Sequence, residues 1–540
     1  RRGARRWSAM EQLMVYHPDL GGEADAENKI LFFHPPTTPL SEQVRCVGLS
    51  EALSNFASSL APGTPCESMH TQNRRYVFEQ VEPRVWFVLI VQHGDSDTPE
   101  EGDRTVGEAE EEIQDAHLKA VLQRLYGTLR FFCGPLLPVL EAQGAPALRT
   151  LIRGFLSRLL ELMLGPTPAS ASASASASSS DSPPPPRALS HAADLLDAMD
   201  GIRFLPVEQR LYLRAQYVVN QIECAHPSVR HCMLLHHDKL VWSGLTHTST
   251  RLLHRYLLQA SATQGALAPA TQAPPSAAAH VLAHGAAPAS QASADVSDLP
   301  DHLLGLALAQ VHQQARVLSA PRHAPSTQQG RFLCGAADPL QDGRSAVRVP
   351  ALLIESVDAA SGAKEERWCR LVVFQVGHTV LALLLEEAPA LWSQPVWYQQ
   401  LGALLASELP ALSAQLAEQH ARLQALDDPH RYIYFNRDNL ALKSSLRDRG
   451  GGSRQGGAAG ALRKGNSRLG VVLSRMHADL AAGDAREIAL KTASDGWLVG
   501  RLSGAREFYM LFDAKYTNFS EVHQEVLALC SLHFSNIFLD

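Results

Sequence analysis

The chain has 540 residues, 45% of them hydrophobic, and a formal net charge of −7 at pH 7. This length predicts about three domains, with enough apolar residues for several cores. The negative charge argues against a nucleic-acid-binding protein. The eight cysteines are scattered and form no C-x-x-C pair, a pattern that favours reduced thiols in a cytosolic protein over a disulfide framework.

The sequence predicts neither a secretory signal nor a membrane helix. The basic segment from Arg1 to Arg6 does not lead into the apolar run that a signal peptide requires. The longest apolar stretch, Leu371 to Leu385, is interrupted by Gln375 and His378. A membrane helix needs about 20 predominantly apolar residues. We therefore interpret this stretch as buried strands and expect a soluble protein.

The first block, residues 12–164, alternates strand and helix patterns. An apolar residue recurs at every third or fourth position from Leu49 to Leu60, which predicts a helix whose apolar stripe packs on a sheet. Two further helices are predicted at Leu118 to Phe132 and at Leu148 to Leu164. Apolar runs predict strands at Leu13 to His17, Lys29 to His34, Cys66 to Gln72, Tyr76 to Glu82 and Trp86 to Val91. This order resembles a longin, or profilin-like, domain, which is a mainly antiparallel sheet with packed helices.

The blocks at 189–428 and 429–540 predict two more α/β units of this type. In the second unit, Val229 to Leu235 and Leu240 to Leu245 predict a hairpin, and further strands and a long helix follow an insertion. The third unit has a strand pattern at Tyr432 to Phe435, three more strands between Ile488 and Phe512, and a closing helix. The units share the order of their elements rather than residue identities.

Three low-complexity segments separate or interrupt the units. They lie at 165–188, at about 260–300 and at 447–467. Their compositions do not build a core, so we expect disordered linkers. The third segment is rich in glycine and arginine and could lie near an anionic membrane, where each basic side chain contributes on the order of 1 kcal/mol. We interpret the acidic run from Asp95 to Asp115 as a solvated loop, with docking of a partner as the alternative.

No catalytic, cofactor or metal site is predicted. The sequence has no G-x-S-x-G elbow and no G-K-[ST] phosphate loop. The densest group of His and Cys residues runs from Cys224 to His237, but its spacing does not match a zinc motif, and His231 and Cys232 would face opposite sides of a strand. We therefore assign this group structural or surface roles. We interpret His70 as an edge-strand or turn residue rather than a catalytic one.

Short segments spread along the chain carry a family resemblance. They include Glu27 to Pro35, Leu240 to Leu245, Gly330 to Leu333, Tyr432 to Asn436, Ser494 to Gly500 and Ser535 to Asp540. In this order they resemble the Ccz family of vacuolar fusion proteins. The resemblance runs through the folded blocks from about Met14 to Asp540 and lapses in the low-complexity segments.

The resemblance implies one subunit of the heterodimeric Mon–Ccz guanine-nucleotide exchange factor, which activates a late-endosomal Rab GTPase. It implies three longin domains, an obligate Mon-family partner, a Rab-binding platform built by the first longin domains of both subunits, and no cofactor. Exchange needs no catalytic acid or base; it needs a surface that binds the nucleotide-free GTPase more tightly than the nucleotide-bound form. A longin adaptor or tether without exchange activity is the alternative, and a hydrolase with an unrecognised site is a more distant one.

The candidate interface lies in the first longin domain, on the predicted helix and on the strand before it. Val47 and Ala52 lie beside the predicted apolar stripe, so we expect them to remain available to another chain. Lys29 could reach an acidic group on a partner, with a solvated lysine as the alternative. The candidates for contact with the partner or the Rab are Lys29, Leu31, Val47, Leu49, Glu51 and Ala52.

Overall fold

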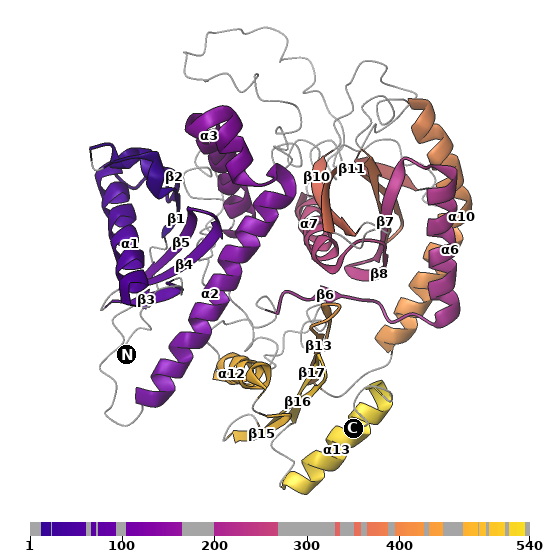
Figure 1. Ribbon diagram of the computed structural model, residues 1–540. Coiled ribbons are helices and arrows are strands. Elements are labelled where there is room, and N and C mark those ends of the chain that lie inside the picture. Colours follow the sequence, from indigo (N-terminus) through magenta and orange to yellow (C-terminus); the bar gives the residue numbers. More distant parts are fainter. Residues whose placement is uncertain are drawn as a thin grey trace, which may run out of the picture.

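The computed structural model describes residues 12–22, 24–60, 66–71, 74–92, 104–164, 199–267, 330–334, 350–357, 364–386, 395–425, 431–445, 468–483, 485–492, 496–512 and 518–534. These residues form three sheets, each with helices packed on it (Figure 1). Most of the low-complexity segments and residues 535–540 lie outside the described residues. The expectations about those segments therefore stay predictions.

All three sheets share one strand order. The orders are β2-β1-β5-β4-β3, β8-β7-β12-β11-β10 and β14-β13-β17-β16-β15. In each unit the first strand lies between the second and the last, and it pairs with the last strand in antiparallel fashion. The same topology in three successive units confirms the predicted fold class of three longin domains.

The first sheet lies between one helix on one face and two helices on the other. Its strands are β1 (Gln12–Tyr16), β2 (Ile30–His34), β3 (Ser68–His70), β4 (Arg74–Glu82) and β5 (Val85–Gln92). Because side chains alternate along a strand, Met14 and Tyr16 pack toward α1 (Leu40–Leu60), while Leu13 and Val15 face the opposite core. That second core is closed by α2 (Arg104–Cys133) and α3 (Leu136–Leu164).

The second sheet contains the long apolar stretch, which forms buried strands as predicted. Its strands are β7 (Val229–His236), β8 (Lys239–Ser243), β9 (Arg331–Cys334), β10 (Ala351–Val357), β11 (Lys364–Val376) and β12 (Thr379–Glu386). One face packs against α6 (Gln209–Ala225) and α10 (Pro395–Ala425). The other face packs against α7 (His247–Leu267) and the helices of the first unit.

The third sheet also carries helices on both faces. Its strands are β13 (Arg431–Asn436), β14 (Ala441–Ser444), β15 (Glu487–Thr492), β16 (Gly496–Ser503) and β17 (Arg506–Phe512). One face packs on α12 (Arg468–Ala482) and the other on α13 (Phe519–Phe534). A short parallel strand, β6 (Ile202–Arg203), extends the sheet beside β14.

The units are joined by shared packing. Phe132 of α2 meets Tyr256 of α7 with ring centroids 4.9 Å apart, so the first and second units share one continuous apolar core. The strand β6 pairs with the third sheet, and Phe204, which follows it, bridges to Leu240 of the second. Arg203 of the same segment forms an ion pair with Asp238, at 2.6 Å between Nη1 and Oδ2. The segment therefore ties the second and third sheets together.

Several expectations about helices were wrong. The helix α2 begins at Arg104, so the second half of the acidic run is helical rather than a loop. The helix α7 continues to Leu267, into the segment expected to be disordered. The helices α6 and α12 were not predicted, although α12 places Leu473, Met476 and Leu480 at helical spacing in the core.

Among the described helices, none is long and apolar enough to span a membrane.

Candidate partner interface

The helix α1 packs on its sheet with a face of mainly small residues. Cys46, Val47, Ser50 and Ser54 are buried there. The sheet opposes them with large side chains, among them Tyr16, Phe33, Tyr76 and Phe78. Small residues on a helix complement bulky residues on a sheet, because cores are filled to the density of a crystal. The buried face of α1 is therefore set by side-chain volume more than by hydrophobicity.

This packing reverses the predicted orientation of α1. The apolar residues Leu49, Phe56 and Leu60 were expected to pack on the sheet, yet they are 44%, 59% and 70% exposed. Only Leu53 of the predicted stripe packs partly against the core. Val47 was expected to lie open to another chain but is only 1% exposed. The expectation was wrong because the apolar period of the sequence marks the outer face of this helix.

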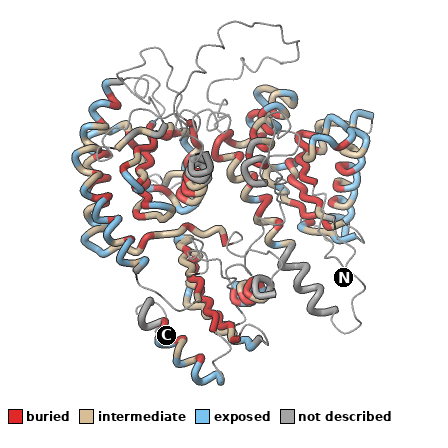
Figure 2. Tube along the Cα trace, turned by 180° about the vertical axis from the view of Figure 1, so that it is seen from behind, coloured by how far each residue is buried: buried red, intermediate tan, exposed pale blue. Residues whose placement is uncertain are grey.

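The outer face of α1 carries an exposed apolar stripe, which we call the α1 stripe. It consists of Gly48, Leu49, Ala52, Phe56 and Leu60. Figure 2 shows α1 with its outward side exposed and the sheet beneath it buried. A Cβ added at Gly48 would meet no atom within 4 Å, so the stripe is open there. Exposed apolar surface of this kind is typical of a protein–protein contact.

Lys29 and Glu51 form an ion pair with each other. Lys29 ends a short 3-10 turn before β2, and its Nζ lies 2.7 Å from Oε2 of Glu51 on α1. The lysine thus has an acidic partner on its own chain, which replaces the solvated side chain considered as an alternative. A role of either residue toward a second protein stays a prediction.

Leu31 lies on the opposite side of the sheet from α1. Its side chain is 1% exposed and belongs to the core beneath α2 and α3. The neighbouring edge of β2 is partly occupied by Arg149 of α3, which donates hydrogen bonds to the carbonyl oxygens of Ile30 and Asn28 at 3.1 and 2.6 Å. Leu31 and Val47 are therefore core residues, and they do not reach the surface. Leu49 and Ala52 are the predicted residues that reach the surface.

The other singled-out residues have structural partners. His70 lies on the edge strand β3, as expected, and its Nε2 is 2.7 Å from Oδ2 of Asp115 on α2. Burial lowers the pKa of His231 on β7. None of the cysteines whose side chains the structure describes takes part in a disulfide. Of the His and Cys group, His236 and His237 come together, and His420 of α10 joins them, a residue that the sequence did not single out.

Comparisons with known proteins support this architecture. Three family models match successive segments of the chain. "First Longin domain of INTU, CCZ1 and HPS4" matches residues 10–134, "Intu longin-like domain 2" matches residues 229–406, and "Intu longin-like domain 3" matches residues 427–529. The three matched segments coincide with the three sheets.

Curated relatives match over almost the entire chain, and each is named "Vacuolar fusion protein CCZ1 homolog". The protein from Danio rerio is 28% identical, over 97% of this chain and 94% of its own length. The protein from Nematostella vectensis is 28% identical, over 96% and 94%. The protein from Dictyostelium discoideum is 24% identical, over 99% and 98%. These near-full-length matches, together with the three matched longin domains, place the chain in the CCZ1 family of vacuolar fusion proteins.

Proposed function

We propose that this chain is one subunit of a heterodimeric guanine-nucleotide exchange factor for a late-endosomal or vacuolar Rab GTPase. Its partner is a Mon-family longin protein, and the complex promotes fusion of vesicles with the vacuole or lysosome. Membership of the CCZ1 family supports this proposal. The structural observation that carries it is the α1 stripe, which leaves Leu49 and Phe56 of the first longin domain exposed.

The proposed mechanism requires no catalytic side chain in this chain, which therefore acts as a regulatory subunit rather than an enzyme. A GTPase holds its nucleotide through switch loops that are ordered by the phosphates and the magnesium ion. An exchange factor binds the open, nucleotide-free state more tightly than the nucleotide-bound state. This difference in binding free energy favours release of the nucleotide. Two rigid longin domains side by side provide such a surface, because their sheets hold the contact residues in fixed positions.

The α1 stripe is suited to the subunit contact. Its large members, Leu49, Phe56 and Leu60, gain free energy when they leave water. Ala52 lies between Leu49 and Phe56, and Gly48 lies beside Leu49 at one end of the stripe; these small residues let a second helix approach closely. The energy of an interface is concentrated in a few desolvated residues, so we assign the largest contributions to Leu49 and Phe56. The ion pair of Lys29 and Glu51 borders this contact from the side of β2.

We also propose that the protein is cytoplasmic and is recruited to the membrane of the late endosome or vacuole from outside. No described helix can span a membrane. Recruitment would then rest on protein partners and on electrostatic contact with anionic lipid. The basic segment at 447–467 has the composition for such contact.

The test measures two quantities on the purified full-length chain: assembly with the Mon-family partner, and release of labelled nucleotide from the Rab. Leu49→Asp and Phe56→Asp place a charge in the contact. We expect each to weaken assembly by at least about tenfold, which corresponds to 1.4 kcal/mol, and to slow nucleotide release in parallel. Leu213→Asp is the matched control, because Leu213 on α6 is 54% exposed and lies in the second unit.

The outcomes separate the proposed functions. Normal assembly and exchange in both α1 variants would place the subunit contact elsewhere on the chain. A wild-type complex that assembles on this face but leaves nucleotide release at its intrinsic rate would favour a longin adaptor or tether.

A further inference from the structure

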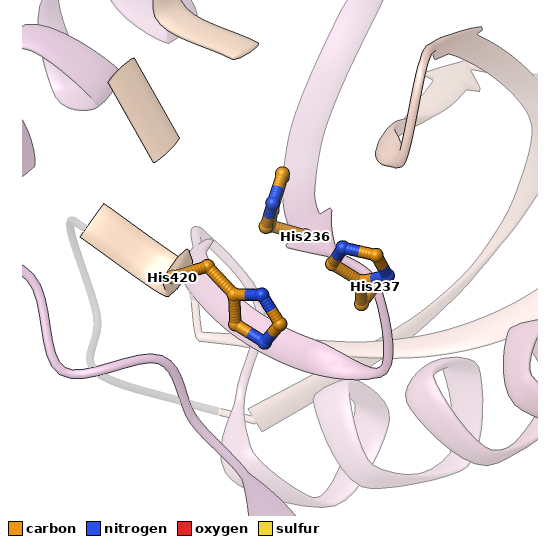
Figure 3. Close-up of side chains that lie close together, drawn as sticks. All are labelled: His236, His237 and His420. Atoms are coloured by element: carbon orange, nitrogen blue, oxygen red, sulfur yellow. The ribbon is translucent and has the colours of Figure 1, made fainter. Parts of the chain in front are cut away.

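Three histidines from two separate parts of the chain meet at one end of the second sheet. His236 is the last residue of β7, His237 follows it in the turn to β8, and His420 lies near the end of α10. Figure 3 shows their imidazole rings gathered in one place. Each ring offers one nitrogen, and these nitrogens all lie within 4.8 Å of one another. The cluster thus joins a hairpin turn to a helix that is distant in sequence.

A chain of hydrogen bonds fixes the proton on His236. Ser413 donates its hydroxyl proton to the carbonyl oxygen of Val376 at 3.2 Å. Thr379 donates its own hydroxyl proton to Oγ of Ser413 at 2.8 Å. The oxygen of Thr379 lies 2.9 Å from Nδ1 of His236 and can only accept a hydrogen bond there, because its one hydroxyl hydrogen points to Ser413. Nδ1 of His236 therefore carries the proton, and Nε2 presents its lone pair.

The lone pair on Nε2 of His236 is buried, and among the described residues no donor forms a hydrogen bond with it. His236 is 1% exposed, and within the described part of the chain its Nε2 has no hydrogen-bond partner. A buried polar atom of this kind carries a free-energy cost and calls for an explanation such as a missing ion. Burial, followed by the nearby His237 and His420, lowers the pKa of His236 to about 4. The observation that points to a ligand is the buried Nε2, which has no hydrogen-bond partner among the described residues.

The groups around the cluster fit a metal ligand set. His237 stacks on His420 at 4.6 Å and on His378 at 4.1 Å between ring centroids. The next carboxylate along the turn, Asp238, is occupied by Arg203 at 2.6 Å. The ligand atoms that converge here are therefore imidazole nitrogens. Imidazole suits zinc, copper, iron and nickel among the divalent metals, and a ligating histidine usually donates its second ring proton to a polar group, as His236 does to Thr379.

We propose that His236, His237 and His420 form a binding site for a divalent transition-metal ion, with Zn²⁺ as the first candidate. Tetrahedral zinc with nitrogen ligands at about 2.0–2.1 Å needs neighbouring nitrogens roughly 3.3 Å apart. His237 is exposed and lies in a turn, so its ring can rotate to close the remaining distance. The fourth position is open to water or to His378.

The site would fix the C-terminal part of α10 to the β7–β8 hairpin. The helix α10 precedes β13, the first strand of the third longin domain. A metal ion at this end would therefore set the position from which the third domain starts. This inference is independent of the proposed exchange function, because it concerns only the stability and geometry of this chain.

The experiment titrates the purified full-length chain, freed of metal by a chelator, with Zn²⁺ in a calorimeter and with Co²⁺ in a spectrophotometer. We expect one ion per chain and the visible bands of tetrahedral Co²⁺. His237→Asn and His420→Gln should each weaken binding at least about tenfold. Asparagine suits residue 237, because the φ of 54° at His237 lies in the left-handed region that asparagine tolerates.

Two further variants complete the test. Thr379→Val removes the group that fixes the tautomer of His236 and should weaken metal binding roughly tenfold while leaving all three imidazoles in place. His247→Asn is the matched control, because His247 is an exposed histidine at the start of α7. Absence of metal uptake by the wild-type chain would overturn the proposal, as would binding that the His237 and His420 variants leave unchanged.

Discussion

Lys29 and Glu51 form an ion pair, with 2.7 Å between Nζ and Oε2, that joins the start of β2 to the middle of α1. Their side chains are only 16% and 25% exposed. Glu51 directly precedes Ala52 of the α1 stripe. The pair therefore holds the proposed subunit contact in a fixed position over the edge of the sheet.

Removing one partner of this pair should loosen α1. We expect Lys29→Met to cost about 1 kcal/mol, because it leaves the carboxylate of Glu51 partly shielded without its cation. The measurement is hydrogen exchange of the α1 amides in the full-length chain. Lys29→Met combined with Glu51→Gln should recover much of the protection. A double variant as unprotected as the single one would show that the pair does not stabilise the helix.

Val47 and Leu49 are two residues apart on α1, but aspartate should have opposite effects at the two positions. At Val47 it buries an unpaired carboxylate, which should destabilise the first domain by 3 kcal/mol or more, on the order expected for a buried charge. At Leu49 it should change stability by no more than about 0.5 kcal/mol and act on partner binding alone. Thermal unfolding of the isolated chain checks both. Equal stability of the two variants would contradict the orientation of α1.

The fold class could be predicted because the sequence repeats one order of strand and helix patterns. The strand from Lys29 to His34 and the hairpin around His236 were predicted within a few residues of their observed bounds. The orientation of α1 could not be predicted. An apolar period indicates that one face of a helix leaves water, and it does not tell whether its own sheet or another protein covers that face.

The histidine cluster shows a second limit of sequence analysis. His236 and His237 stood out as neighbours, but strand geometry gave no reason to expect a third ligand. His420 lies on α10, after all the strands of its sheet, and only the packing of that helix brings it to the hairpin. Contacts between residues so distant in sequence leave no local pattern. The helix α12, by contrast, could have been predicted, because Leu473 and Met476 recur at helical spacing in the sequence.

The third longin domain contains a fully buried carboxylate whose titration should affect stability in acid. Burial raises the pKa of Glu507, but hydrogen bonds and charge from His477, Tyr509 and Arg437 outweigh it and hold the pKa below its ordinary value. The unfolded chain therefore takes up this proton at a higher pH than the native protein. The stability that Glu507 contributes is present above pH 4.5, its ordinary value, and is lost as the pH falls through the lower native pKa.

Glu507→Gln tests this dependence. At neutral pH it should cost roughly 3 kcal/mol, because Arg437 keeps a partly shielded charge without its partner. Below pH 4.5 the variant should lose less further stability than the wild type. Unfolding monitored by hydrogen exchange of β17 at a series of pH values measures both effects. Glu418→Gln on the exposed surface of α10 is the control and should follow the wild-type profile.

Phe132 should stabilise the joint between the first and second longin domains. Its side chain is fully buried, and its ring centroid lies 4.9 Å from Tyr256 of α7 and 5.8 Å from Phe155 of α3. Phe132→Ala should cost about 3–5 kcal/mol, since it opens a cavity where α2, α3 and α7 meet. Because that cavity lies between two domains, we expect earlier exchange of the α7 amides than of those in β13. Phe56→Ala is the control: it removes a phenyl ring from the surface and should leave the stability and the amide exchange of α7 and β13 unchanged. Equal loss of protection throughout the chain would show that the domains unfold as one unit.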